Sequence, residues 1–296
     1  MQNKRKHHRY TAAAVLLALL LSLCFSTGVT AQSAWPREDT GGIHIPYFER
    51  IPVSLAGGGR INDCVLINET TYAPLRSFSD ALLDCDVSFD EKTRTATVKS
   101  DNLYLTARDG APYIAANGRY LYTDTPVKIL SDGRMYIPIR LLARAFGVEI
   151  GWNAASRSVT VSGSVKPILS GDKFYREDEV YWLSRIISAE SRGEPLLGQI
   201  AVGNVVLNRV KSRDYPNTIW GVIFDRRGGV QFSPVLNGSV YNEPYYTSVI
   251  AAKLCLEGVT VSEDVLFFYR PEHSTSFWIP ENRPYAFRIG HHYFFY

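Results

Sequence analysis

A carboxylate stands where a helical pattern calls for a core residue. Apolar side chains recur at helical spacing at Leu183, Ile186 and Ile187, and the next position on that face is Glu190. Burial against the apolar face and the negative end of the helix dipole both disfavour the charged carboxylate. We therefore expect the pKa of Glu190 to rise, so that it is partly protonated near neutral pH, as a general acid requires.

A purely structural role for Glu190 is the competing hypothesis. In this hypothesis the carboxylate pairs with Arg192, Arg209 or another cation and only holds the end of the helix. Gly193 is predicted to be the C-cap of this helix, because glycine readily adopts the left-handed conformation that ends helices. The pattern alone leaves both roles open.

The next segment, residues 196–210, is apolar on nearly every side, which predicts a helix at the centre of a domain. Asn204 and Asn208 interrupt it one turn apart. Because buried amides need hydrogen-bond partners, we expect these two side chains to bind carbonyl groups of loops.

An internal repeat precedes this region, over residues 66–98 and 130–161. The matching positions are Tyr72, Pro74, Arg76, Phe89, Arg94 and Val98 in the first copy, and Tyr136, Pro138, Arg140, Trp152, Arg157 and Val161 in the second. In the second copy the pattern predicts a turn at Asp132-Gly133, a short strand, a helix over 141–146 that Gly147 ends, and two further strands. Residues 164–172 are rich in Ser, Gly and Pro and are predicted to be a linker.

The first 31 residues have the pattern of a secretory signal peptide. Lys4, Arg5, Lys6 and Arg9 precede an apolar run over 12–25, and small residues follow at 29–31. An uncleaved N-terminal anchor is the alternative. Cleavage removes four of the 32 basic residues and leaves 28 against 29 acidic ones, so nothing in the charge indicates nucleic-acid binding. We expect a secreted protein with no membrane segment after cleavage; its oligomeric state is not predicted.

Three cysteines remain after the signal peptide, at Cys64, Cys85 and Cys255, too few for a disulfide framework. The spacing neither predicts nor excludes a disulfide bridge between Cys64 and Cys85. No cluster of His, Cys and carboxylates has metal-ligand spacing, so neither a metal site nor a cofactor is predicted. The predicted organisation is a signal peptide (1–31), a lead-in (32–51), the repeat domain (52–163), a linker (164–175) and a C-terminal domain (176–296).

The repeat domain resembles the copper amine oxidase N-terminal-like domain of secreted proteins. Copper binding is not expected, because the region contains no histidine after His44. Tyr72 and Tyr136 could stack on sugars, but a tyrosine before a buried Pro-x-Arg element is more typical of structural use. We expect a spacer or a module that associates with the cell wall.

The C-terminal domain resembles the SleB-type cell wall hydrolases, the spore cortex-lytic enzymes. The similarity is carried by SAESRGEPLLGQIAVGNVVLNRV, by YPNTIWGVIF and by shorter pieces further on. It implies a helix-rich α+β domain similar to lysozymes and lytic transglycosylases, hence an α+β protein, acting on the glycan strand of peptidoglycan. The family's catalytic glutamate falls at Glu190. Ser188, Ser191 and His291 depart from its usual residues.

Six further residues are candidate substrate contacts. Aromatic rings can stack on sugars, and polar side chains can bind hydroxyl or N-acetyl groups; the candidates are Gln231, Phe232, Ser233, Tyr269, Trp278 and His292. For each aromatic residue, a place in the hydrophobic core is the alternative.

The reaction depends on whether a second carboxylate is present. Hydrolytic glycosidases usually need one, and Glu194, Asp225 and Glu243 are the candidates. Glu194 is more consistent with binding backbone amides at its turn. A lytic transglycosylase needs only one glutamate, which favours that reaction. The alternatives are a hydrolytic glycosidase and a wall- or spore-associated binding protein with little or no turnover.

Overall fold

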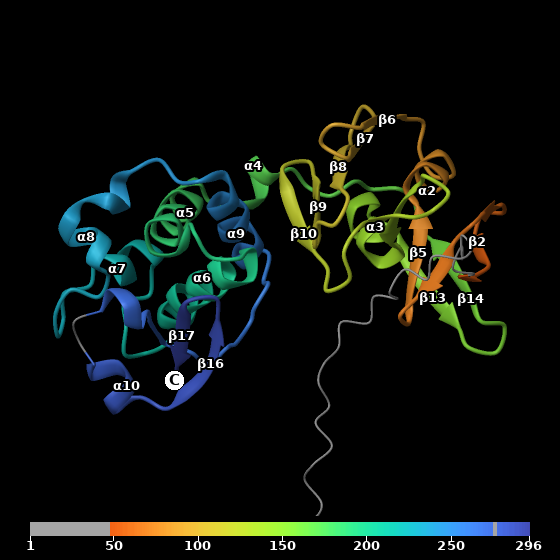
Figure 1. Cartoon of the computed structure of the whole chain (residues 1–296). Helices are drawn as coiled ribbons and strands as arrows, with labels where there is room; N and C mark the ends of the chain where they lie inside the picture. Colours follow the sequence, from red (N-terminus) through yellow and green to blue (C-terminus); the bar gives the residue numbers. More distant parts are fainter. Residues whose placement is uncertain (1–47, 275–276) are drawn as a thin grey trace, which may run out of the picture. The chain divides into compact units, whose positions relative to one another are not determined.

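The computed structural model describes residues 48–274 and 277–296, which form a β-rich repeat domain followed by a helix-rich domain (Figure 1). The predicted α+β class is confirmed. The predicted signal peptide and the lead-in up to residue 47 lie outside the described residues.

The two copies of the sequence repeat contain the same elements in the same order. The first copy consists of β4 (Val65–Ile67), β5 (Thr70–Pro74), α2 (Leu75–Asp80), β6 (Asp86–Asp90) and β7 (Thr95–Lys99). The second consists of β11 (Lys128–Ile129), β12 (Met135–Pro138), α3 (Ile139–Phe146), β13 (Glu149–Asn153) and β14 (Ser158–Ser162). Strands β5 and β12 pair antiparallel, with Pro74 opposite Tyr136 and Tyr72 opposite Pro138. Equivalent residues therefore exchange places across this pair, as an approximate twofold axis requires.

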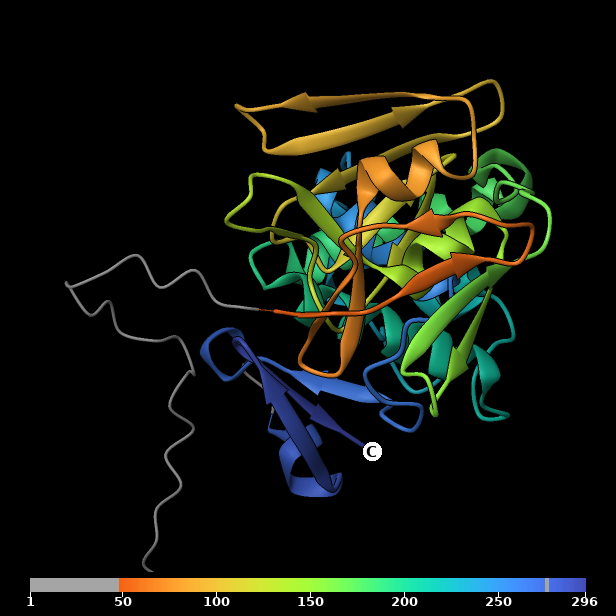
Figure 2. The same cartoon turned by 90° about the vertical axis from the view of Figure 1, so that its right-hand side faces the viewer.

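The other strands of this domain extend the two copies differently. They are β1 (Glu49–Arg50), β2 (Val53–Leu55), β3 (Arg60–Ile61), β8 (Tyr104–Arg108), β9 (Tyr113–Ala116) and β10 (Arg119–Tyr122). The β6–β7 hairpin, gold in Figure 2, continues into the sheet β10-β9-β8-β7-β6, whereas β13–β14 joins β2 and β3. A third sheet has the order β1-β4-β5-β12-β11 and contains the contact between the copies.

The core of the repeat domain contains the predicted helix residues. Gly147 ends α3 in the left-handed conformation, with φ of 67°, as predicted, although the helix begins two residues earlier than expected, directly after Pro138. Phe78 of α2 and Phe146 of α3 meet edge to face, with ring centroids 5.2 Å apart. Equivalent faces of the two copies thus meet in one core.

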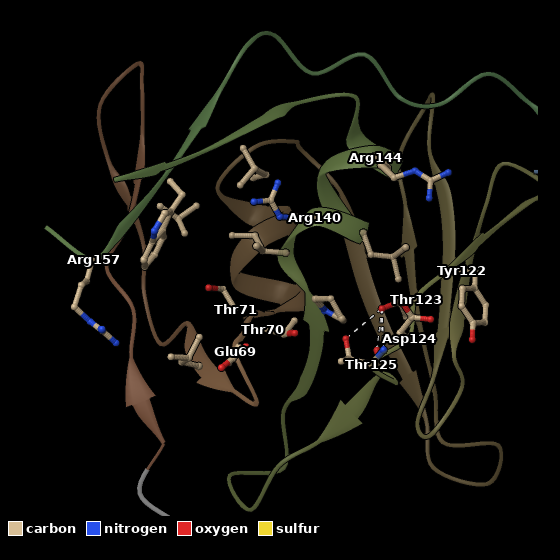
Figure 3. Close-up of a pocket in the computed structure, with 17 residues that line it drawn as sticks. Glu69, Thr70, Thr71, Tyr122, Thr123, Asp124, Thr125, Arg140, Arg144 and Arg157 are labelled. Atoms are coloured by element: carbon tan, nitrogen blue, oxygen red, sulfur yellow. Dashed lines mark hydrogen bonds between the residues drawn. The ribbon is translucent and has the colours of Figure 1, made fainter. Parts of the chain in front are cut away.

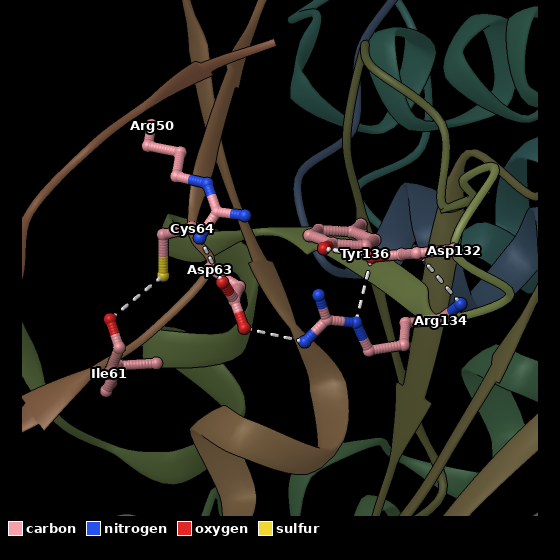
Figure 4. Close-up of polar contacts among 7 residues, drawn as sticks. All are labelled: Arg50, Ile61, Asp63, Cys64, Asp132, Arg134 and Tyr136. Carbon is pink, nitrogen blue, oxygen red and sulfur yellow. Dashed lines mark hydrogen bonds and ion pairs between the residues drawn. The ribbon is translucent and has the colours of Figure 1, made fainter. Parts of the chain in front are cut away.

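Tyr72 and Tyr136 are structural rather than sugar platforms. They are 1% and 2% exposed, so neither ring face is open to a ligand. The Tyr136 hydroxyl donates to Asp132 at 2.8 Å, and Arg134 links Asp132 to Asp63 (Figure 4). The described cysteines are all free, so the Cys64–Cys85 bridge left open by the sequence is not formed.

The predicted linker packs along the repeat domain. The Lys166 amide donates to the carbonyl of Phe146 at 2.9 Å, and the Ile168 amide donates to Ala145 at 3.0 Å. These bonds satisfy carbonyl groups at the end of α3, and a short helix, α4 (Gly171–Phe174), follows.

The helix-rich domain is built around three helices, α5 (Glu177–Ser191), α6 (Leu196–Lys211) and α9 (Tyr246–Leu256), which pack against one another (Figure 1). A three-stranded sheet with the order β15-β17-β16 completes it. The remaining elements are α7 (Ile219–Ile223), α8 (Ser233–Asn237), η1 (Ser239–Tyr241), β15 (Phe267–Tyr269), η2 (Pro271–His273), α10 (Trp278–Asn282), β16 (Tyr285–Ile289) and β17 (His292–Phe295). None of the helices in the described part is both long and apolar enough to cross a bilayer.

Helix α6 lies at the centre of this domain, as its apolar composition predicted. The two buried amides on it bind loop carbonyls: Asn204 donates to Val259 at 2.9 Å, and Asn208 donates to Ser262 and Val265 at 3.0 Å each. These bonds fasten the segment that leads into β15 to the central helix.

The prediction that Gly193 caps α5 is wrong. The helix ends at Ser191, and its C-cap is Arg192 in a right-handed conformation. Gly193 is not among the residues with positive φ. The chain turns directly into α6, with the Glu194 amide donating to the Ser191 carbonyl at 2.9 Å, so the short connection needs no left-handed residue.

Candidate active site

Glu190 lies in the last turn of α5, on the face predicted from the sequence. Leu183, Ile186 and Ile187 on that face are fully buried, and Glu190 is partly buried. Burial raises the pKa of its carboxyl group to about 7, while the positive charge of Arg209 acts in the opposite direction. The direction expected from the sequence is confirmed.

The carboxylate of Glu190 has no partner among the described residues. It accepts no hydrogen bond there, and it forms no ion pair with Arg192 or Arg209, which the structural alternative required. The Arg192 guanidinium instead lies 5.5 Å from the centre of the Tyr245 ring. Glu190 is therefore available to exchange a proton with a ligand.

Arg209 of α6 connects several of the candidate residues. Its guanidinium is buried, with Nε donating to the Leu266 carbonyl at 2.7 Å and Nη1 donating to the Gln231 side chain at 3.4 Å. It also lies 5.2 Å from the ring centre of Phe232 and 5.3 Å from that of Phe267. The same charge acts on Glu190, so Arg209 is the fixed cation of this site.

The sequence analysis predicts only one role for Arg209, as an ion-pair partner of Glu190. A signal for a larger role is present, because a cation stands in a helix that is otherwise almost wholly apolar. Arginine is almost never fully buried unless its donors are satisfied, so its place in such a helix indicates a specific polar environment.

The six candidate substrate contacts differ widely in accessibility. Phe232 and His292 are each 2% exposed, and Phe232 packs near Phe268, so the core alternative describes its ring. Tyr269 is also buried, and its hydroxyl has no hydrogen-bond partner among the described residues. Ser233 is exposed and Gln231 is partly buried, while Trp278 is 51% exposed with its ring centre 6.3 Å from that of Phe267.

Glu194 binds the turn between β16 and β17. Its buried carboxylate accepts a hydrogen bond from the His291 amide at 2.9 Å and lies 3.2 Å from Nδ1 of the same residue. His292 Nδ1 is 3.7 Å away and Arg270 is 3.9 Å away. The carboxylate does bind a backbone amide, but this amide belongs to a turn 97 residues away, so the prediction that it binds amides of its own turn is wrong. Among the residues described, no group of three or more His, Cys, Asp or Glu side chains is arranged to hold a metal ion.

Replacing Gly290 with alanine is expected to loosen this contact. Gly290 has a φ of 56°, and a methyl group there would overlap Oε2 of Glu194. We expect the free energy of unfolding to fall by about 2 kcal/mol, measured by urea denaturation. Gly133→Ala is the control, because Gly133 also has positive φ but open space around it. Equal losses in the two variants would show that the overlap with Glu194 contributes nothing.

The other two candidate second carboxylates are also engaged. Asp225 is buried and accepts hydrogen bonds from the Arg227 amide and side chain at 3.0 Å, and these bonds lower its pKa. Glu243 is largely exposed and pairs with Arg185 at 2.8 Å. Of the two, only Asp225 is close enough for its negative charge to raise the pKa of Arg209, and the charge of Glu190 has the same effect.

Comparisons with known proteins give two family matches. Residues 193–295 match the family described as Cell Wall Hydrolase, and residues 62–161 match the copper amine oxidase N-terminal domain. The first match begins three residues after Glu190 and does not include it. The catalytic role of this glutamate is therefore argued from its burial and its charged neighbours.

Individual relatives agree with the C-terminal match. A spore cortex-lytic enzyme of Bacillus cereus is 38% identical over 120 residues, which cover 40% of this chain and 45% of that enzyme. Cell wall hydrolase CwlJ of Oceanobacillus iheyensis is 31% identical over 104 residues, 33% of this chain and 72% of that protein. The solved catalytic domain of the germination-specific lytic transglycosylase SleB from Bacillus anthracis is 36% identical, with a TM-score of 0.38, over 44% of this chain and 100% of that one. This chain thus spans less than half the length of the spore cortex-lytic enzyme it matches.

Proposed function

Because the chain belongs to the cell wall hydrolase family, we propose that its helix-rich domain cleaves the glycan strand of peptidoglycan. The bond cleaved joins N-acetylmuramic acid to N-acetylglucosamine, and Glu190 is the catalytic acid. One observation carries the proposal: a carboxyl group with a pKa of about 7 that has no ion-pair partner among the described residues. A general acid is most effective when its pKa lies near the working pH.

The proposed reaction is that of a lytic transglycosylase. Glu190 protonates the glycosidic oxygen as the bond to C1 of the muramic acid breaks. The resulting carboxylate then takes the proton from the C6 hydroxyl of the same sugar, whose oxygen bonds to C1 and closes a 1,6-anhydro ring. One residue acts first as acid and then as base, and no water is consumed.

Two features support a single-carboxylate reaction. Glu194, Asp225 and Glu243 are each held by a partner from their own surroundings, so none is a free nucleophile. Arg209 also opposes the effect of burial on Glu190, so it stabilises the carboxylate that exists between the two proton transfers. Burial therefore favours the protonated form of Glu190, and Arg209 favours its ionised form.

The candidate substrate contacts have different roles in this proposal. Trp278, Ser233 and Gln231 are accessible enough to contact the glycan directly. Tyr269 is buried, and its hydroxyl is enclosed with no hydrogen-bond partner among the described residues, so this structure does not expose it to the glycan. Phe232 and His292 are buried, so they position other residues: Phe232 lies against Arg209 and His292 lies beside Glu194.

Hydrolysis is the second candidate function. It requires a carboxylate to activate water or to act as nucleophile, and Asp225 is the residue whose charge reaches the same arginine as that of Glu190. Its bonds to Arg227 would then hold it ionised, as a general base needs.

The location and the organisation of the chain complete the proposal. We propose export through the signal peptide at residues 1–31, action in the cell wall or the spore cortex, and two modules at 52–163 and 176–296 joined by the linker at 164–175. The repeat domain then serves to associate the enzyme with its insoluble polymer.

Product analysis tests the reaction. The mature protein and a Glu190→Gln variant are incubated with purified peptidoglycan, and released muropeptides are identified by mass spectrometry. Anhydro-muropeptides from the wild type alone are the expected result, whereas reducing ends would support hydrolysis. Failure to release muropeptides, with the protein still sedimenting with the polymer, would overturn the enzymatic proposal and leave a binding protein.

A further inference from the structure

A cavity of about 830 Å³ opens in the repeat domain, and Glu190 is not among the residues that line it (Figure 3). Its wall is formed by the β4–β5 hairpin, the loop after β10, the first turns of α3 and the β13–β14 hairpin. Trp152 lies on this wall and is 48% exposed, so part of its indole ring is accessible to a ligand. The cavity is large enough to hold an oligosaccharide or a peptide fragment.

The internal repeat allows the cavity residues contributed by the second copy to be compared with their equivalents in the first copy. In the first copy, Arg76 donates to the Val87 carbonyl at 2.7 Å and supports its own hairpin. Its equivalent, Arg140, makes no hydrogen bond or ion pair within the described part of the chain and faces the cavity instead. Trp152 stands where the first copy has Phe89. The two rings are almost equally exposed, at 47% and 48%, so the second copy differs in having the larger ring and an arginine with no partner among the described residues.

The charges around the cavity are arranged in two groups. Arg140 and Arg144 are one turn apart on α3, in the upper part of Figure 3, and the carboxylates of Glu69 and Asp124 lie in the lower part. Arg157 is already paired with Glu49 at 2.7 Å. Arg144 lies 4.0 Å from Glu257, and that carboxylate is held at 2.7 Å by Arg119. Arg140 is therefore the cation most available to a ligand, with Arg144 beside it.

Hydroxyl groups supply neutral hydrogen-bonding positions on the same wall. Thr70, Thr71, Thr123 and Thr125 line the cavity, and the Thr123 hydroxyl donates to the Thr125 carbonyl at 3.0 Å. An indole face, a guanidinium and several hydroxyls together match a sugar ring that bears a carboxylate. The ring would stack on the indole, and the carboxylate would bind the planar guanidinium.

We infer that this cavity binds an acidic glycan, with a sugar ring on Trp152 and a carboxylate on Arg140. The inference rests on the proposed function for the identity of the polymer, which is the peptidoglycan strand, whose muramic acid units carry peptide stems with free carboxylates. The acidic edge at Glu69 and Asp124 then faces amino groups carried by the same strand. The repeat domain thus holds the polymer that the helix-rich domain cleaves.

Sedimentation with insoluble peptidoglycan tests this site in the full mature chain. All variants carry Glu190→Gln, so that the polymer stays intact and binding is measured without turnover. Trp152→Ala is expected to weaken the apparent Kd about tenfold, and Arg140→Ala about fivefold, since stacking and a charged hydrogen bond are each worth roughly 1–2 kcal/mol. Phe89→Ala is the matched control for the tryptophan, and Arg60→Ala, an exposed arginine outside the cavity, is the control for Arg140.

A modified polymer tests the acidic character of the ligand. Peptidoglycan whose carboxyl groups have been converted to neutral amides is expected to bind about fivefold more weakly to the parent chain, and no more weakly to Arg140→Ala. Unchanged binding by Trp152→Ala and Arg140→Ala would overturn the inference, and so would equal binding of native and amidated polymer. Thermal unfolding of each variant confirms that the domain is intact. Binding of the polymer by the chain with Glu190 intact, without release of muropeptides, would refute the proposed enzymatic function alone, so the two failures are distinguishable.

Discussion

Replacement of Glu190 by glutamine is expected to lower the rate of glycan cleavage by about 10³-fold. Glutamine keeps the size and the hydrogen-bonding shape of the side chain but cannot give up or accept the catalytic proton. The other carboxylates of α5 all lie in its first turn, at the opposite end of the helix, so no neighbour on the helix can replace Glu190. The rate is measured as soluble muropeptide released per unit time from purified peptidoglycan.

The same helix offers a control for this variant. Glu177 is the first residue of α5 and is exposed, so Glu177→Gln removes a carboxylate from the far end of the helix without touching the site. This variant is expected to keep the rate of the wild type within about twofold. A Glu190→Gln variant that retains more than a tenth of the activity would show that another group donates the proton.

The pH dependence of activity should follow the titration of Glu190. The reaction starts from the protonated carboxyl group, whose pKa is about 7. We expect kcat/KM to be highest at pH values where this group is protonated and to fall about tenfold per pH unit well above pH 7. Initial rates with a soluble glycan fragment, measured between pH 5 and pH 9, test this expectation. A profile that stays flat to pH 9 would exclude Glu190 as the acid.

The pH dependence of stability should differ between the wild type and the Glu190→Gln variant, because only the wild type carries this titrating carboxyl group. Since the pKa is raised from its ordinary value of 4.5 to about 7, the folded protein binds this proton more tightly than the unfolded chain. Wild-type stability therefore falls as pH rises from about 4.5 to about 7, and the loss is complete above pH 7. Glutamine has no ionisation to lose, so the variant should be more stable at pH 8 by at most about 3 kcal/mol and by little at pH 5. Urea denaturation at both values measures the gain; a gain at pH 5 as large as that at pH 8 would contradict the expected titration.

Local patterns in the sequence predicted much of this protein. The repeat, the turn at Gly147 and the central position of α6 all follow from periodicity and from single residues with strong conformational preferences. The direction of the pKa shift of Glu190 was also predicted from local information, because its helix places the carboxyl group on an apolar face that the core buries. The failure at Gly193 shows the limit of such reasoning. A glycine near a helix end predicts a left-handed cap only if the next segment leaves in the direction that such a cap imposes, and here α6 begins too soon.

The sequence by itself therefore determined the repeat and the position of the acidic residue on its helix, because both are visible as residue patterns within single segments, and its resemblance to a known family implied the α+β class. Only the tertiary structure decided how the candidate residues are used. It joined Arg209 to Leu266, 57 residues along the chain, and Glu194 to His291, 97 residues along. It buried Phe232 and His292, left Trp278 exposed, and opened a cavity beside Trp152. These outcomes depend on how whole elements pack against one another, and no pattern within a single helix or strand carries that information.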